Sequence, residues 1–301
     1  MQKNKIWFSF IIIQNQDMKG VTVAMKLSAK RVDELNALCN KFRIDVITQL
    51  HKIQTGHPGG SLSVCEILTA LYFEKANTDG ANPLDSNRDR IILSKGHAAP
   101  MLYRILAEKG YFPLSDFAHL RQFGSHLQGH PSNHDTPGIE IPTGPLGLGL
   151  GVGVGKALAL KLDNNPAHVY VIMGDGELNE GTVWESAMSA YKYKLDNLTV
   201  IVDRNNVQLD GTSDEIMPMG DVGKKFESFG FNVLYCDGHD ISAVCDNLDK
   251  ARDFKGLPTV IVAETIKGKA VSFMEGKSAW HGSPINDELF AKAIEELGGA
   301  L

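Results

Sequence analysis

The stretch HVYVIMGDGELNEG, from His168 to Gly181, joins a strongly apolar run to an aspartate that stands between two glycines. The run VYVIM has the length and the β-branched content of a buried strand, and the turn residues after it indicate where the strand ends. In a parallel α/β sheet, ligands gather at the carboxyl ends of the strands, and glycines there let the backbone approach a bound phosphate. Asp175 by itself could equally be a helix cap, so the rest of the sequence has to decide its role.

Three further runs of the same kind follow at 198–203, 231–236 and 258–264, with segments of helical length between them. This rhythm predicts an α/β fold with a mostly parallel sheet and helices on both faces. Upstream, apolar residues recur at three- and four-residue steps, which predicts an amphipathic helix: Leu35, Leu38, Phe42, Val46 and Leu50. No composition break or long linker follows Met25, so we expect one α/β domain over residues 27–301.

Composition excludes several classes of protein. The chain has 301 residues, 43% of them hydrophobic, and a net charge of −6 without clustered basic residues, which argues against a nucleic-acid partner. Its four cysteines, Cys39, Cys65, Cys236 and Cys245, form no C-x-x-C pair, so we expect a reducing compartment, the cytoplasm. The apolar run Ile6–Ile13 is too short to span a membrane and lacks a cleavage site. We therefore interpret residues 1–26 as an extension, artefactual or disordered, with Met18 and Met25 as alternative starts.

The glycine-rich stretch TGPLGLGLGVGVGKALALKL, residues 143–162, fits neither familiar phosphate loop. Its Gly155-Lys156 pair lacks the other residues of a Walker A loop, and no start position completes G-x-G-x-x-G. Gly147, Gly151 and Gly155 stand at four-residue steps, which predicts a smooth helix face packed closely against another backbone. A membrane helix is a minor alternative, because two lysines interrupt the stretch.

A second polar cluster supports a metal site. The strand at 198–203 is followed by Arg204, Asn205 and Asn206, so two successive strands deliver a carboxylate and a carboxamide to one sheet edge. Both are oxygen donors suited to a hard cation such as magnesium or calcium. Magnesium keeps few protein ligands and completes its shell with phosphate oxygens and water, so the predicted ligand is a diphosphate.

The motif pair GDGELNEG and DRNNVQLDG resembles the thiamine-diphosphate motif, and the surrounding sequence resembles the N-terminal half of transketolase. The flanking motifs stand in family order: TGHPGG (55–60), SKGHAAP (94–100), GHP (129–131), TGPLG (143–147) and WHGSP (280–284). The resemblance runs from about residue 27 to about residue 284 and implies the thiamine-diphosphate-binding fold of the diphosphate (PP) domain.

The resemblance also implies roles for individual residues. The metal, Mg²⁺ with Ca²⁺ or Mn²⁺ as substitutes, would be held by Asp175, Asn205 and the carbonyl of Val207. The residues that would contact thiamine diphosphate are Asp175, Asn205, His97, Gly144, Leu146, Gly176, Glu180, Ile266 and His281. Glu180 resembles a family acid in a network that joins paired active sites.

Four of the ten histidines match the family's motifs: His57, His97, His130 and His281. By resemblance they would surround the reactive carbon of the cofactor, with His57 and His281 moving protons and His130 binding the terminal hydroxyl of the donor. Imidazole suits this work because it can give and take a proton near neutrality. His126, His130 and His134 are also spaced like zinc ligands on a helix, but Gly129 and Pro131 would break that helix. We interpret His126, His134 and His239 as surface or core histidines.

The implied reaction transfers a two-carbon ketol unit from a ketose (phosphate) donor to an aldose acceptor. In full-length relatives the glutamate that activates the cofactor lies on a second domain, which this chain lacks. We therefore expect a split transketolase whose C-terminal subunit supplies that glutamate, as an α2β2 assembly; the alternative is a truncated longer enzyme.

Two other functions stay open at this point. One is the α subunit of a 2-oxo-acid dehydrogenase E1 component, which would not call for this set of histidines. The other is a module that binds thiamine diphosphate without catalysis.

Overall fold

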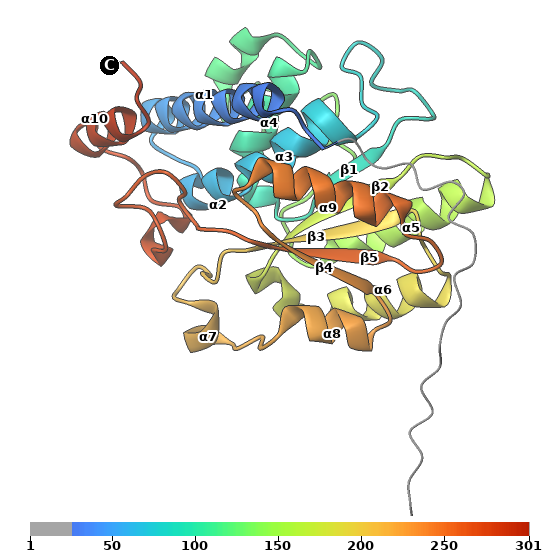
Figure 1. Ribbon diagram of the computed structural model, residues 1–301. Coiled ribbons are helices and arrows are strands. Elements are labelled where there is room, and N and C mark those ends of the chain that lie inside the picture. The colour runs from blue at the N-terminus through green and yellow to red at the C-terminus, as the bar shows by residue number, and fades with distance from the viewer. Residues whose placement is uncertain (1–25, 301) are drawn as a thin grey trace, which may run out of the picture.

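The computed structural model describes residues 26–300 (Figure 1). Expectations about residues 1–25, including the alternative starts, lie outside this range. The strands are β1 (Arg90–Leu93), β2 (Val169–Gly174), β3 (Leu198–Arg204), β4 (Asn232–Asp237) and β5 (Thr259–Glu264). The α-helices are α1 (Ala29–Ile53), α2 (Pro58–Ser63), α3 (Cys65–Ala70), α4 (Ala99–Glu108), α5 (Leu148–Leu162), α6 (Gly181–Lys192), α7 (Ser213–Ile216), α8 (Val222–Ser228), α9 (Ile241–Asp253) and α10 (Asp287–Glu296). Short turns of other helix types are η1 (Leu71–Lys75), η2 (Gly96–Ala98), η3 (Leu114–His119), η4 (Gly176–Asn179) and η5 (Ser278–His281).

The five strands form one parallel sheet in the order β1-β2-β3-β5-β4. The four strands predicted from the sequence are confirmed. The edge strand β1 was not predicted, because its four residues, RIIL, are too few to show a periodicity.

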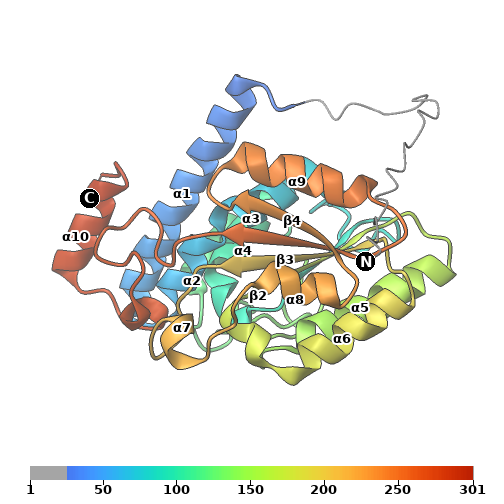
Figure 2. The ribbon, with the colours of Figure 1, turned by 60° about the horizontal axis from the view of Figure 1, so that its bottom comes forward.

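Alternate residues of each central strand face two separate apolar cores. In β2, Val169, Val171 and Met173 pack with α5, α6 and α8, whereas Tyr170 and Ile172 pack with α1, α3, α4 and α9. Figure 2 shows these helices on the two faces of the sheet. Burial on both faces explains why the strands read as continuous apolar runs, since side chains alternate between the faces.

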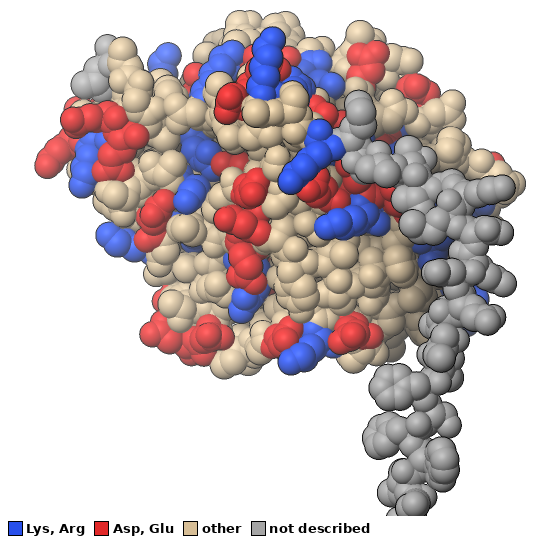
Figure 3. All heavy atoms as spheres, in the orientation of Figure 1, with Lys and Arg blue, Asp and Glu red and all other residues tan. Residues whose placement is uncertain are grey.

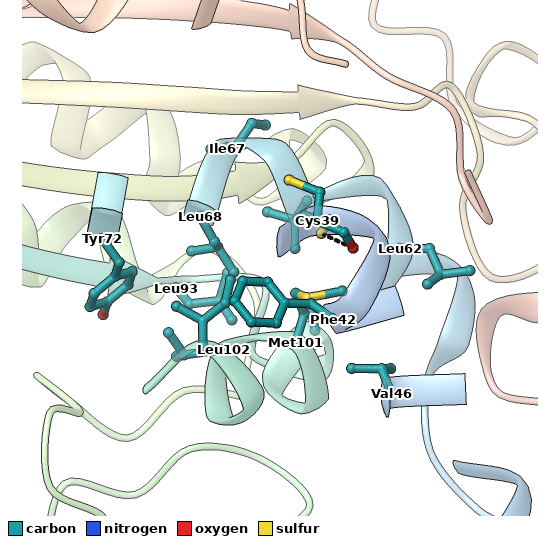
Figure 4. Close-up of a cluster of buried hydrophobic side chains, with 14 of the residues drawn as sticks. Cys39, Phe42, Val46, Leu62, Ile67, Leu68, Tyr72, Leu93, Met101 and Leu102 are labelled. Carbon is teal, nitrogen blue, oxygen red and sulfur yellow. Dashed lines mark hydrogen bonds between the residues drawn. The ribbon is translucent and has the colours of Figure 1, made fainter. Parts of the chain in front are cut away.

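The predicted amphipathic helix is α1. Ser28 caps it by accepting a hydrogen bond from the Arg31 amide (3.2 Å), and its apolar stripe is buried. In Figure 4, Phe42 and Val46 from α1 lie among side chains of α2, α3 and α4. This core packs α1, α2, α3 and α4 together on one face of the sheet.

The expectation of one smooth glycine face on α5 holds only in part. A Cβ on Gly155 would meet nothing within 4 Å, and Gly147 precedes the helix with a φ of 84°. Gly147 and Gly151 are approached by side chains near and on α6, with added Cβ atoms 2.6 Å from Glu180 and 3.2 Å from Ser186. The glycines of α5 that pack against the sheet side are Gly149, whose Cβ would lie 2.3 Å from the Ser94 hydroxyl, and Gly153, whose Cβ would lie 2.5 Å from Val171. Both sets of glycines have helical spacing, so only the position of the sheet could show which set is buried.

The surface charges, the cysteines and the helices can each be compared with what the composition predicts. Figure 3 shows acidic and basic side chains interspersed on one face. The four cysteines, all within the described residues, are free thiols. Between residues 26 and 300, no helix combines the length and apolar character needed to cross a bilayer.

The two glycines of α5 give a matched test of the packing. Gly153→Ala should lower the free energy of unfolding by about 1–3 kcal/mol, because the added methyl group overlaps Val171. Gly155→Ala should raise it by about 0.5–1 kcal/mol, because alanine favours an exposed helix position more than glycine. Urea unfolding of the two variants measures both changes in the free energy of unfolding. Shifts of the same sign would mean that α5 does not lie against β2 as described.

Candidate active site

A cavity of about 260 Å³ lies where the parallel strands end, near α2 and η5. Segments that follow β1, β2, β3 and β5 all contribute to it, because parallel strands present their carboxyl ends at one edge. Its lining consists of His57, Gly60, Lys95, His97, His130, Gly144, Leu146, Gly174, Asp175, Gly176, Glu177, Asn205, Val207, Gln208, Leu209, Lys267 and His281. Residues far apart in the sequence therefore share one site.

Four histidines gather on one side of the cavity. The ring centre of His57 lies 5.7 Å from that of His97, 5.8 Å from His130 and 5.3 Å from His281. His97 and His281 are 4.9 Å apart. These are the four histidines singled out from the motifs, and the structure brings all of them together.

Burial keeps these imidazoles neutral. It lowers the pKa of both His57 and His281 to about 4, with smaller contributions from the positive charges of Arg121 and Lys267 respectively. The pKa values of His97 and His130 are also lowered, again mainly by burial. Neutral rings can accept a proton at physiological pH, which a protonated ring cannot.

Asp175, which is only 3% exposed, is held by three hydrogen bonds and lines the cavity together with Asn205 and Val207. Its Oδ2 accepts hydrogen bonds from the Asn206 amide (2.8 Å) and the Ser213 hydroxyl (3.0 Å), and its Oδ1 accepts one from the Gly176 amide (3.0 Å). The side-chain oxygen of Asn205 lies 3.2 Å from the Val207 amide. The helix-cap interpretation is thus also true of Asp175, but its carboxylate forms no ion pair with any residue in the range 26–300.

The donor set fits a hard cation. Burial, and then the charge of Asp203, raise the pKa of Asp175, so a cation beside it would relieve both effects. Nowhere in the described part of the chain do three or more His, Cys, Asp or Glu side chains form a metal site by themselves. A metal here would therefore depend on Asn205 and a backbone carbonyl as well, which is the oxygen-only set that magnesium accepts.

Two buried polar atoms are available to a ligand. His57 Nδ1 and Gln208 Nε2 have no hydrogen-bond partner among residues 26–300. Both residues line the cavity, and leaving such groups unpaired is costly. A polar ligand that meets them would remove that cost.

The sequence did not reveal Lys267, whose amino group reaches the same place. Its Nζ donates to the carbonyls of Val207 (3.3 Å) and Gln208 (3.1 Å) and lies 3.1 Å from His281 Nδ1. Burial, followed by the charge of Lys95, lowers its pKa to about 8. Its only signal in the sequence is its place three residues after a strand.

A buried ion pair between Lys95 and Asp203 lies beneath the cavity. Asp203 also accepts hydrogen bonds from the Ser63 hydroxyl (2.6 Å) and from Thr265. Burial alone would raise the pKa of Asp203, but the charge of Lys95 and the hydrogen bonds from Lys95, Ser63 and Thr265 together outweigh burial, so the pKa is lowered. Lys95 lies in the SKGHAAP motif and Asp203 ends a predicted strand, yet neither was identified as a site residue.

Glu177, one residue beyond the GDG motif, joins three segments of the site. Its carboxylate accepts hydrogen bonds from the amides of Gly147 (2.8 Å) and Gly174 (3.2 Å) and from Ser94. Burial raises its pKa, although these hydrogen bonds oppose the shift. It therefore fixes the TGPLG loop to the end of β2.

Other predicted residues lie elsewhere. Glu180 and Ile266 are outside the cavity lining, and Glu180 is exposed at the start of α6. Residues 126–134 form no helix, so the spacing of His126, His130 and His134 does not place them on one face. The roles assigned to individual residues stay predictions.

Comparison with known proteins gives concordant matches. Residues 35–300 match the family model described as "Transketolase, thiamine diphosphate binding domain". The 6-deoxy-6-sulfo-D-fructose transketolase subunit SqwG of Clostridium sp. is 41% identical, with 90% of this chain and 98% of the relative covered. An apulose-4-phosphate transketolase subunit of Actinobacillus succinogenes is 45% identical over 80% of this chain and 87% of the relative.

Solved structures show the same likeness. Transketolase from Campylobacter jejuni superposes with a TM-score of 0.82 at 33% identity, covering 91% of this chain. The chain spans 43% of the length of that transketolase.

The lowered histidine pKa values predict how stability depends on pH. In the unfolded chain these rings take up protons below their ordinary pKa of 6.5, whereas His57 and His281 in the folded chain do so only near 4. The unfolded state thus binds more protons between these values, and the free energy of unfolding should fall as the pH is lowered through this window.

The double variant His57→Asn/His281→Asn should lose less stability than the unmodified chain over the same range. Urea unfolding at several pH values between about 4 and about 7 measures the difference in the free energy of unfolding between the variant and the unmodified chain. Acids with raised pKa values contribute equally to both proteins and therefore drop out of this difference. Parallel curves would mean that these two rings titrate normally in the folded chain.

Proposed function

The chain belongs to the transketolase family through its thiamine-diphosphate-binding domain, and from this premise we propose that it is the N-terminal subunit of a two-chain transketolase. The reaction is the transfer of a two-carbon ketol unit from a ketose donor to an aldose acceptor. One observation carries the proposal: four histidines from separate segments share a cavity with Asp175, Asn205 and Val207. Bound thiamine diphosphate supplies the electron sink that such a transfer requires.

The part of the cavity lined by Asp175, Asn205 and Val207 is the proposed binding site for the diphosphate and its Mg²⁺, for which Ca²⁺ or Mn²⁺ can substitute. Asp175, Asn205 and the Val207 carbonyl are the metal ligands in this proposal. Gly176 lies beside Asp175 and, with His97, is assigned to the diphosphate; Gly144, Leu146 and Ile266 are assigned to the rings. The two unpaired atoms, His57 Nδ1 and Gln208 Nε2, support a polar ligand in this cavity.

The positive charge of Lys267 supports an anion in this part of the cavity. Its ammonium already lies 3.3 Å from the Val207 carbonyl, so a divalent cation on that carbonyl would repel it. An anion bound beside both charges removes the repulsion. We therefore assign Lys267 to the diphosphate as well, a role that also explains why a lysine is kept partly desolvated here.

The histidines perform the proton movements. His57 and His281 are neutral at physiological pH because burial lowers their pKa values, so each can accept a proton from a substrate hydroxyl and return it. His130, on the long segment before α5, is assigned to the terminal hydroxyl of the donor. The two named relatives act on sugars with a phosphate or a sulfo group, and we propose an anionic sugar here too.

Apolar side chains around the cavity support a partner chain. Leu146, Leu148 and Leu209 are 37%, 53% and 60% exposed, and two of them belong to the cavity lining. Two relatives are named as subunits, and the match to this chain covers 98% and 87% of their respective lengths. The proposed partner is a C-terminal transketolase subunit that supplies the activating glutamate in a cytoplasmic α2β2 assembly, with Glu180 near the contact between paired sites.

Calorimetry with the aspartate variant tests cofactor binding. Asp175→Ala should weaken magnesium-dependent binding of thiamine diphosphate by at least about 100-fold, since even residues that only orient a metal ligand are worth about 10–100-fold. The matched control is Asp221→Asn, an exposed carboxylate that caps α8. Unchanged affinity in the Asp175 variant would remove the proposed metal site, and no binding by the unmodified chain would remove the proposed cofactor.

Turnover tests the role of His130. With the partner subunit present, His130→Ala should reduce kcat/KM for ketol transfer by roughly 10–100-fold while leaving cofactor affinity unchanged, because a lost hydrogen bond to the terminal hydroxyl of the donor costs about 1–3 kcal/mol. His134→Ala, at an exposed position outside the cavity lining, is the control. Equal losses of cofactor affinity and turnover would show that His130 serves the cofactor instead.

A further inference from the structure

His239 lies outside the cavity lining but is connected to it by a chain of buried contacts. Its Nδ1 is 2.9 Å from Glu66, and its Nε2 accepts a hydrogen bond from the Ile266 amide (2.8 Å). We propose that His239 is a positioning residue that holds Lys267, and through it His281, in place for cofactor and substrate. The inference rests on the proposed function and extends it to a residue that the sequence left as an ordinary core histidine.

The first step is the protonation of the His239 ring. An amide N–H can only donate, so Nε2 must accept and the ring hydrogen must be on Nδ1, facing Glu66. Glu66 is a carboxylate paired with Arg43 (2.6 Å). The side chains of Arg43, Glu66 and His239 are 6%, 6% and 10% exposed, so a change of tautomer would leave a buried polar group without a partner.

The second step is the backbone around Ile266. The Thr265 amide donates to the Arg204 carbonyl (3.0 Å) and the Gly268 amide to the Gly59 carbonyl (3.0 Å). The Gly276 amide donates to the Lys267 carbonyl (2.9 Å). Between Thr265 and Gly268, His239 holds the Ile266 amide, so a side chain from another segment sets the backbone directly before Lys267. The segments that carry His239 and Ile266 are closely packed, since a Cβ on Gly238 would lie 2.4 Å from the Thr265 side chain.

The third step leads from Lys267 to His281. The ammonium of Lys267 has no acceptor capacity, so it donates to His281 Nδ1 (3.1 Å). The hydrogen of the neutral His281 ring is therefore on Nε2. A displaced Lys267 would leave His281 free to adopt either tautomer, and a ring in the wrong tautomer cannot make the hydrogen bond that its role requires.

Nitrogen-15 NMR of the histidine-labelled chain tests the first and third steps without any cofactor. The expected spectrum has His239 protonated at Nδ1 and His281 at Nε2. In His239→Leu and in Lys267→Met, His281 should show a mixture of tautomers. An unchanged His281 signal in the His239 variant would overturn the proposal, and this result does not depend on whether the chain binds thiamine diphosphate.

Calorimetry with Mg²⁺ and inorganic pyrophosphate tests the connection to the cofactor site. His239→Leu should weaken binding roughly tenfold, in the range found for residues that orient metal ligands. His239→Gln should restore it, because the amide offers one acceptor and one donor. The control is His168→Leu, which removes a buried histidine bonded to Thr199 at the opposite end of β2 and β3 from the cavity, and should not change the affinity.

A double variant separates positioning from general destabilisation. If His239 acts through Lys267, adding His239→Leu to Lys267→Met should cause no further loss of pyrophosphate affinity. An additive loss, or failure of glutamine to rescue, would overturn the proposal. No pyrophosphate binding by the unmodified chain, with the NMR result as expected, would remove the proposed function but leave the positioning of His281 by His239 through Lys267 established.

Discussion

The buried ion pair of Lys95 and Asp203 is the interaction on which the site depends. Asp203 lies near the carboxyl end of the central strand β3, and Lys95 follows the edge strand β1. Hydrogen bonds from Ser63 and Thr265 connect α2 and the segment after β5 to the same carboxylate. A buried pair of this kind is strongly destabilising to break, because either partner alone is an uncompensated charge. Four segments that carry site residues are therefore held by one carboxylate.

Electrostatics divide the cavity into two parts. Lys267 and the Asp175 oxygens form a charged end, where the pKa of the lysine is lowered and that of the acid is raised, both mainly by burial. The histidines form a neutral end, where the same burial prevents protonation. An anionic cofactor with its cation is suited to the first end, and proton transfer to the second.

Local motifs predicted much of this arrangement. The continuous apolar runs gave four of the five strands, and the polar residues after two of them gave Asp175 and Asn205, which do lie at one edge. The four motif histidines do converge. Sequence reasoning missed five residues of the site: Lys95, Glu177, Asp203, Lys267 and Gln208. Their importance depends on partners 30 or more positions away or on a cavity that forms only when several loops meet.

The sequence by itself determined the class of fold and the type of ligand, because strand periodicity and the order of motifs are properties of the chain. Tertiary structure alone decided which glycines of α5 are buried, which histidines have neutral rings, and that Lys267 stands between Val207 and His281. The physical reason is that burial and long-range hydrogen bonds depend on neighbours from other segments. A residue's spacing along the chain shows its face on an element, but not what the opposite element places against it.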